Sequence, residues 1–180
     1  MRSGYTLIRG LFLLSAAAIA GCSEGPPKRA ELDAIAAMQR VHGQVETNAD
    51  GHAVKLMLGG SALRDGDLAP IAELHDLTFL DLGRTTITDA GLAHLAGLSE
   101  LQILSLAGTK ITDKGLAHLA KLPSLETLDL EGMAINDQGL AELATITSLR
   151  KVYVSRTGGP SKRGIDNLES ANPRVHVTQQ

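Results

Sequence analysis

A 24-residue repeat constrains the fold of this chain more than any other feature of its sequence. Gly-Leu-Ala-His-Leu-Ala at 91–96 returns at 115–120, and three near-complete rows begin at Leu77, Leu101 and Leu125. Self-similarity at a fixed period of this length is typical of units that cannot bury their apolar side chains alone. The rows are therefore predicted to stack, so that each completes its core against its neighbours.

Two spacings of apolar residues alternate within each row. Leu80 and Leu82 are two residues apart, as in a strand, whereas Leu92, Leu95 and Leu98 have the spacing of a helical stripe. Each row therefore predicts a strand, a turn, a short helix and a second turn. We expect polar residues to cap the helix starts, drawn from the pairs Thr88/Asp89, Thr112/Asp113 and Asn136/Asp137.

The row L-x-x-L-x-L-x-x-T-x-I-T-D-x-G-L-x-x-L-x-x-L resembles the leucine-rich repeat family, from Ala53 to about Asn172. The resemblance implies an α/β right-handed solenoid, with a concave parallel sheet, short convex helices and protein partners. The chain departs from the family pattern after the strand, where Asn or Cys is usual. The residues here are Thr85, Thr109, Thr157, Ser61 and Met133. Because a thioether cannot donate, we expect weaker bonding between turns at Met133.

The two ends of the stack need caps that cover the core. Residues 29–40 predict an amphipathic helix with Leu32, Ile35 and Met38 inward, and 41–58 predict two strands around a turn at 48–51. A degraded helix around Ile165 and Leu168 and a short final strand are expected at the other end. The resulting division is a helix-hairpin cap at 30–52, repeats at 53–172 and a terminal strand at 173–180, within one domain at 30–180.

The N-terminus has the pattern of a secretory signal. Arg2 and Arg9 precede the apolar run LFLLSAAAIA, which is too short to span a bilayer and ends at Gly21-Cys22. The stretch Ile-Ala-Gly-Cys resembles the lipobox of bacterial lipoproteins, with Cys22, the single cysteine, as the lipidated residue. An ordinary signal peptide with a chance cysteine is the alternative.

The lipobox resemblance predicts a leader at 1–21, a lipidated Cys22 with a short linker to residue 29, and a place in the bacterial cell envelope. By resemblance to enterobacterial sorting, Ser23 favours the outer membrane.

The composition bears on the partners. Net charge is −3 and no basic stripe occurs, so nucleic acid is not expected. The chain has no Trp and only two Phe and two Tyr, which leaves an aliphatic core. Of these aromatics, Phe79 and Tyr153 alone lie outside the leader, at strand positions that the repeat leaves open to solvent.

Side chains between the strand leucines should form columns across the concave sheet, with neighbouring strands about 4.8 Å apart. Phe79, Ile103 and Tyr153 are apolar or amphipathic where the repeat does not require it, which favours a binding face. The alternative is that large β-formers only cover the sheet. The predicted protein-binding residues are Phe79, Asp81, Arg84, Ile103, Ser105, Asp129, Glu131, Lys151, Tyr153 and Arg156.

Three other functions are weighed against protein binding. Asp81 and Asp129 should lie about 9–10 Å apart, near the separation in inverting glycosidases, but an open sheet provides no dry pocket for a hydrolase. His94 and His118 occupy equivalent positions in adjacent rows, yet two histidines make a poor metal site. We therefore expect no catalysis, metal, cofactor or small-molecule substrate. A structural envelope lipoprotein without a specific ligand remains the alternative.

Overall fold

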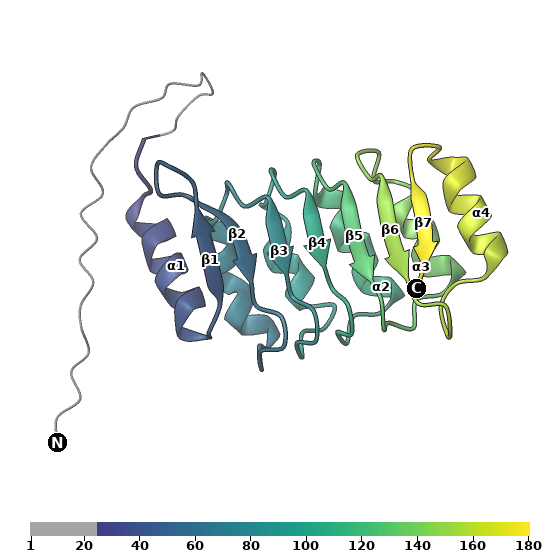
Figure 1. Ribbon diagram of the computed structural model, residues 1–180, viewed down its shortest axis with the longest axis horizontal. Helices are drawn as coiled ribbons and strands as arrows, with labels where there is room; N and C mark the ends of the chain where they lie inside the picture. The colour runs from purple at the N-terminus through teal and green to yellow at the C-terminus, as the bar shows by residue number, and fades with distance from the viewer. Residues whose placement is uncertain (1–24) are drawn as a thin grey trace.

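Residues 25–180 are described by a computed structural model, in which seven strands form one sheet in the order of the chain (Figure 1). β1 runs antiparallel to β2, and each later strand runs parallel to the one before it. The strands are β1 (Gln44–Thr47), β2 (Ala53–Met57), β3 (Phe79–Asp81), β4 (Ile103–Ser105), β5 (Thr127–Leu130), β6 (Lys151–Val154) and β7 (His176–Gln179).

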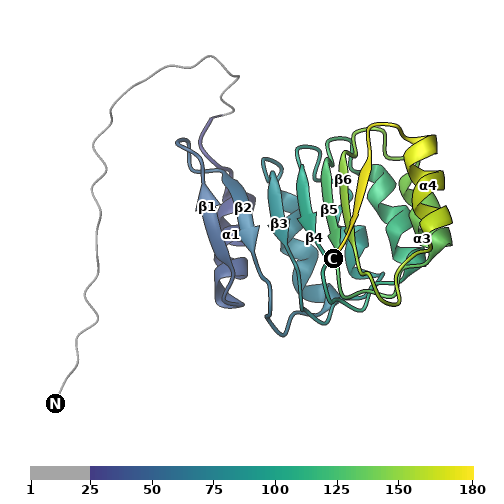
Figure 2. The ribbon, with the colours of Figure 1, turned by 45° about the vertical axis from the view of Figure 1, so that its right-hand side comes forward.

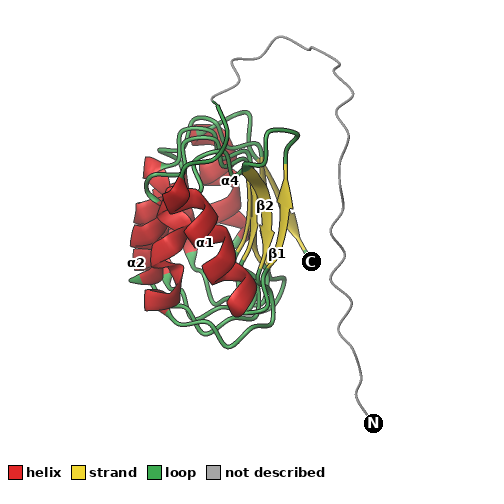
Figure 3. Cartoon of the chain, turned by 90° about the vertical axis from the view of Figure 1, so that its left-hand side faces the viewer, coloured by secondary structure: helices red, strands yellow, loops and turns green. Residues whose placement is uncertain are grey.

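Helices cover one face of this sheet, and Figure 3 shows the two layers edge-on. The helices are α1 (Arg29–Arg40), η1 (Asp65–Glu73), η2 (Gly91–Leu95), α2 (Asp113–Leu116), η3 (Ala117–Lys121), α3 (Asp137–Leu143) and α4 (Lys162–Ala171), where η marks a 3-10 helix. The predicted alternation of strand and short helix is confirmed. We call the sheet face away from the helices the concave face.

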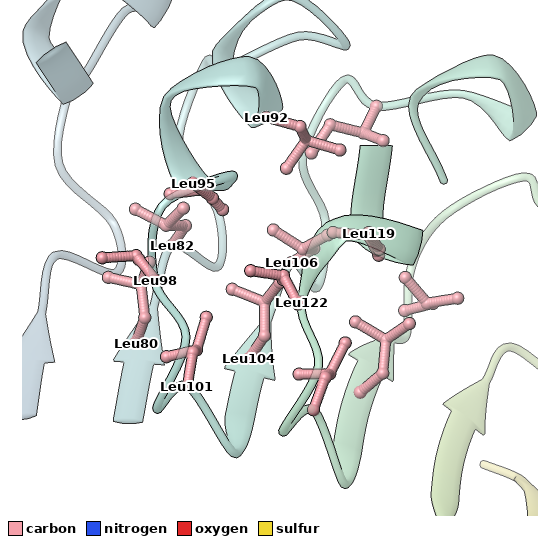
Figure 4. Close-up of a cluster of buried hydrophobic side chains, with 14 of the residues drawn as sticks. Leu80, Leu82, Leu92, Leu95, Leu98, Leu101, Leu104, Leu106, Leu119 and Leu122 are labelled. Carbon is pink, nitrogen blue, oxygen red and sulfur yellow. The ribbon is translucent and has the colours of Figure 1, made fainter. Parts of the chain in front are cut away.

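The core lies between the sheet and the helices and is almost entirely aliphatic. Figure 4 shows leucines from the strands and from the convex segments pointing into the same layer. Leu80, Leu104 and Leu128, one row apart in sequence, are each 0% exposed in neighbouring strands. Each leucine thus packs against its equivalents in the next rows, which is how stacking completes the core.

Hydroxyl groups after the strands bond within their own rows. Thr85 Oγ1 donates to the Leu82 carbonyl at 2.7 Å, and Thr109 Oγ1 donates to the Leu106 carbonyl at the same distance. Met133 is buried and its Sδ lies 3.7 Å from Thr109 Oγ1. The hydroxyls of Thr85 and Thr109 bond carbonyls of their own rows, so the premise of the prediction was wrong: the absence of a hydroxyl at Met133 does not remove a hydrogen bond of this kind between turns.

Aspartates join the rows on the convex side, and we call this series the aspartate ladder. Asp89 accepts two hydrogen bonds from Thr112 of the next row, from the backbone N–H and from Oγ1, both at 2.7 Å. The same two-point contact recurs along the solenoid in the pairs Asp65–Thr88, Asp113–Asn136 and Asp137–Ser161. Each ladder aspartate therefore ties its own row to the start of the next.

The ladder changes the predicted helix caps. Thr112 stands at the N-cap of α2, but its side chain donates to Asp89 of the previous row and caps nothing. The expectation that Thr112 or Asp113 would cap its own helix was wrong, because both side chains are engaged by neighbouring rows. Asn136 does cap α3, with its Oδ1 accepting the Gln138 N–H at 2.7 Å.

The glycine of the repeated Asp-x-Gly motif makes room for the ladder. A Cβ added at Gly91 would lie 2.6 Å from Asp65 Oδ1, a distance that real Cβ contacts do not show. Added at Gly115 or Gly139 of the same motif, a Cβ would collide with the carboxylate of Asp89 or Asp113, and at Gly164, which has no Asp two residues before it, with that of Asp137. The motif therefore supplies the carboxylate for one joint and the space for another.

The ladder perturbs two of its carboxyl groups. Burial raises the pKa of Asp65, but hydrogen bonds from the Thr88 N–H and hydroxyl outweigh that effect, so its pKa lies below the ordinary value. The hydrogen bond from the Ser161 hydroxyl, joined by one from the Ser161 N–H, lowers the pKa of Asp137. These joints are therefore made by ionised carboxylates near neutral pH.

The N-terminal cap consists of α1 and the β1–β2 hairpin, which meet at one end of the solenoid (Figure 2). The buried stripe of α1 is Glu31, Ala34 and Met38. The prediction that Leu32 faces inward was wrong, since Leu32 is 51% exposed. Glu31 takes that inward position because its carboxylate accepts hydrogen bonds from the hairpin.

The predicted signal peptide, Cys22 and Ser23 lie outside the described residues. Within residues 25–180, none of the helices has the length and apolar character needed to cross a membrane.

Candidate protein-binding face

The concave face carries two rows of side chains that cross the strands. Equivalent strand positions pair in register from β2 to β6. The first row is Lys55, Phe79, Ile103, Thr127 and Lys151, and the second is Met57, Asp81, Ser105, Asp129 and Tyr153. The predicted columns are confirmed as neighbours in the sheet.

The first row has an apolar centre between charged ends. Ile103 is 40% exposed. Among the described residues, Ile103 and Leu32 are the exposed large hydrophobic residues. Half-buried Phe79 lies beside it on β3. Lys55 pairs with Glu46 at 2.9 Å, whereas Lys151 has no ion pair within residues 25–180. An apolar patch thus lies open in the middle of the sheet.

The second row is acidic and partly self-bonded. Asp81 Oδ1 accepts the Gly83 N–H at 2.8 Å, and Asp129 Oδ1 accepts the Glu131 N–H at 3.0 Å. Both aspartates thereby fold the turn that ends their strand, a local use typical of Asp. Ser105 Oγ also donates to Asp129 Oδ2 at 3.3 Å. The sequence signal for this role is an Asp two residues before the residue whose N–H it accepts; the prediction from the strand columns did not include it.

Three predicted site residues lie in the turns after the strands. Arg84, Glu131 and Arg156 follow β3, β5 and β6 and therefore border the two rows. Arg84 has φ of 57°, a left-handed conformation that its row equivalents reach as Gly60, Gly108 and Gly132. This conformation is unfavourable for a residue with a Cβ. The arginine thus occupies a position where the backbone alone would favour glycine.

Arg84 borders a shallow hollow of about 310 Å³ at the ends of β2, β3 and β4. Its walls are formed by Gly59, Gly60, Asp81, Gly83, Arg84, Ser105 and Ala107. A second hollow of about 550 Å³ adjoins Gly59 and Gly60 and reaches Arg40 and His42 at the end of α1. Spacing along one row could not reveal either hollow, because each is built by small residues from several turns.

The concave face is charged but unpaired at its centre. Among the described residues, Asp81, Asp129 and Glu131 have no ion pair, and neither have Arg84 and Arg156. The acids lie on β3, β5 and the turn after β5, whereas Lys151, Tyr153 and Arg156 gather at β6. The structure therefore presents an acidic and apolar centre beside a basic, aromatic end.

The geometry of the two alternative sites is also defined. Ser105 of β4 lies between Asp81 and Asp129, so two strand spacings, about 9–10 Å, separate them. His94 and His118 lie on η2 and η3, on the convex side. Within residues 25–180, His, Cys, Asp and Glu residues form no group of three that could hold a metal ion.

Comparisons with known proteins agree with this architecture. Residues 75–135 match the family described as leucine rich repeat. No curated protein shows a significant match to the sequence. Among solved structures, internalin C2 from Listeria monocytogenes is 30% identical, with 62% of this chain and 46% of that chain covered and a TM-score of 0.49.

The Arabidopsis receptor kinase HAESA, solved with the peptide hormone IDA and the co-receptor SERK1, is 16% identical to this chain. The match covers 75% of this chain and 27% of that one, with a TM-score of 0.51. The chain spans less than half the length of these solved structures. The fold is a leucine-rich-repeat solenoid, and the leucine rich repeat match covers the rows from Leu77 and Leu101 and the first part of the row from Leu125.

Proposed function

We propose that this solenoid is a non-enzymatic module that binds another protein through its concave face. The observation that carries the proposal is the exposed Ile103 beside Phe79, set among unpaired charges on a face that the described helices leave open. Protein interfaces combine an apolar centre with a polar rim, and the two rows offer a partner both kinds of group.

The charge distribution indicates the chemistry of the partner. Asp81, Asp129 and Glu131 favour basic groups over the centre of the sheet, whereas Lys151 and Arg156 favour an acidic group beyond β5. Complementary charges of this kind fix the orientation of a partner more than they raise its affinity. We therefore propose a partner surface with an apolar anchor, a basic part and an acidic part in that arrangement.

We assign no catalytic role to Asp81 and Asp129. Their carboxylates already accept backbone hydrogen bonds that shape the turns after β3 and β5. These structural contacts explain why Asp occurs at both positions without any catalytic role.

Replacing Tyr153 and Arg156 together with Ala should abolish capture of the partner. Binding energy at protein interfaces is concentrated in a few aromatic and arginine residues, and this pair is the strongest such cluster on the concave face. The measurement is capture of cross-linked partners from envelope extracts, identified by mass spectrometry, with circular dichroism to show that melting stays near wild type.

The matched control replaces His94 and His118 on the convex side, which should leave capture intact. If capture depends on the histidines and not on Tyr153 and Arg156, the interface lies on the convex side and the proposed concave face is wrong. No reproducible partner for the wild-type protein would favour the alternative, a structural envelope lipoprotein without a specific ligand.

We also propose that the domain at 30–180 is held at a bacterial membrane, with the outer membrane favoured, through a lipid on Cys22 after removal of residues 1–21. The support is the sequence pattern Ile-Ala-Gly-Cys after a short apolar run. The seven residues 23–29 would then be a linker of at most roughly 23 Å, at about 3.3 Å per residue, between the lipidated Cys22 and the fold.

Replacing Cys22 with Ser should leave an unlipidated precursor, because a hydroxyl does not replace the thiol in acyl transfer. Metabolic labelling with palmitate measures the difference, with label expected on the wild type alone. Equal labelling of both proteins, or of neither, would rule out lipidation at Cys22.

A further inference from the structure

His52, in the N-terminal cap, makes two hydrogen bonds from one buried ring. It is 7% exposed and lies between the hairpin turn and β2. Its Nδ1 is 2.8 Å from Glu31 Oε2 of α1, and its Nε2 is 2.8 Å from the carbonyl oxygen of Gly25. The imidazole therefore connects three separate segments of the cap.

The partners of the ring define its protons. The Gly25 carbonyl can only accept, so Nε2 must donate to it. Glu31 Oε1 accepts the Ala53 N–H at 3.0 Å, and an ionised Glu31 also accepts at Oε2, so Nδ1 must donate as well. The contacts therefore require one more proton than a neutral imidazole next to an ionised carboxylate would supply.

Residues 25–28, which we call the N-terminal strap, have few other attachments. Pro26 and Pro27 carry no N–H, and among the described residues Gly25 to Pro27 make no hydrogen bond other than the one to His52. The Pro27 ring lies over Gly51. A Cβ added at Gly51 would be 3.5 Å from both Cδ and Cγ of Pro27. The Gly25–His52 bond is thus the polar contact that holds the strap on the hairpin.

We propose that His52 is a pH-dependent latch, which holds the N-terminal strap against the cap when protonated and releases it when the ring loses a proton. With Glu31 ionised, the proton that stays on the ring is the one on Nδ1, since a carboxylate is a stronger acceptor than a carbonyl. The lone pair of Nε2 then faces the Gly25 oxygen, and that bond is lost. Opening is therefore selective for the strap and leaves the Glu31 contact in place.

The charged groups around the ring act mainly in favour of the closed form. Asp76 Oδ2, from the loop after η1, lies 3.8 Å from Nδ1. A hollow of about 400 Å³ beside the ring is also lined by Lys28, Glu73 and His75. The hydrogen bond to Glu31, followed by that to Gly25, raises the pKa of His52 above 6.5, against the opposing effect of burial. The closed latch therefore contributes fully below 6.5 and is lost as the pH rises through the folded value.

The consequence concerns the position of everything that precedes the domain. A closed latch fixes the point where the chain leaves the cap, and an open latch lets that point move away from the hairpin. The inference concerns the end of the solenoid and is independent of the proposed concave binding face.

The test is an NMR titration of the full 180-residue chain in detergent micelles, from pH 5.5 to pH 9. Long-range ¹H–¹⁵N correlations report protonation of the His52 ring, and the heteronuclear NOE of the Gly25 amide reports order in the strap. We expect both ring nitrogens to be protonated at the acidic end. The Gly25 NOE should then fall with the same midpoint as His52, above 6.5, while that of Met38 in α1 stays constant.

Glu31→Gln gives the opposite expectation. Its amide oxygen still accepts the Ala53 N–H, and its NH₂ donates to Nδ1, so a neutral ring keeps its proton on Nε2 and its bond to Gly25. The Gly25 NOE should therefore stay high across the titration. His75→Ala, at a residue that lines the same hollow without a hydrogen bond to the strap, should titrate as wild type.

A wild-type Gly25 NOE that does not follow the His52 midpoint would overturn the latch. Release of the strap in Glu31→Gln with the wild-type midpoint would do the same. His52→Ala should show a mobile strap at every pH. If that variant does not fold, the wild-type and Glu31→Gln titrations still decide.

Discussion

Leu104→Asp should unfold most of the domain. Leu104 is 0% exposed on β4, with Leu80 and Leu128 beside it in the neighbouring strands. A carboxylate there would have no partner in an aliphatic core, and such burial costs several kcal/mol. Domains of this kind have a total stability of about 5–15 kcal/mol, so one such change removes much of it. Thermal melting followed by circular dichroism measures the loss.

The matched control is Gln102→Asp, two residues earlier in the same row. Gln102 is exposed, and its contacts with neighbouring rows are made by its backbone N–H and carbonyl. An exposed substitution of this type usually changes stability by at most about 0.5 kcal/mol. Equal melting temperatures for the two variants would contradict the assignment of inward and outward positions in and just before β4.

Gly115→Ala should destabilise the solenoid by about 1–3 kcal/mol, the usual cost of overpacking. The added Cβ would collide with the Asp89 carboxylate, and it would lie 2.8 Å from Ile111 Cγ2. Relief requires Asp89 to move, which breaks its two hydrogen bonds to Thr112. The expected fall in melting temperature is about 2–4 °C per kcal/mol for a domain of this size.

Gly97→Ala provides the comparison within the same repeat. A Cβ at Gly97 would lie 4.0 Å from the Ala72 carbonyl oxygen, an ordinary contact distance, and the φ of Gly97 is not positive. Alanine there should be neutral or stabilising by about 0.4–1 kcal/mol, through lower entropy of the unfolded chain. Should Gly115→Ala melt no lower than Gly97→Ala, the aspartate ladder would not require the glycine of the motif.

Much of the fold could be predicted from the sequence because the repeat appears three times. The repeat places Leu80, Leu104 and Leu128 one period apart. One assignment of inward and outward positions therefore holds for every row. The cap was harder, because it occurs once. Counting apolar residues placed Leu32 inside α1, whereas Glu31 is inside because its carboxylate has partners on the hairpin. A pairing between segments 21 residues apart leaves no periodic signal.

The concave face was partly predictable for the same reason. The strand period placed Phe79, Ile103 and Tyr153 toward solvent, and the register between strands places them in two adjacent rows. The additional roles of Asp81 and Asp129 as turn acceptors depend on backbone geometry that spacing does not specify. Hollows such as the one beside Arg84 arise from several turns together, so no single row predicts them.

The aspartate ladder makes whole rows interchangeable. If residues 101–124 were excised, Asp89 would meet Asn136, a residue that already donates the same two-point contact to Asp113. The joint between rows would be preserved, but Asp81 would become a direct neighbour of Asp129, about 4.8 Å away across one strand spacing. Gain or loss of rows by duplication and deletion would thus conserve the scaffold while redrawing its concave surface. In such a chain, a change in the number of rows would change which partner the concave surface fits, while the joints between rows stay the same.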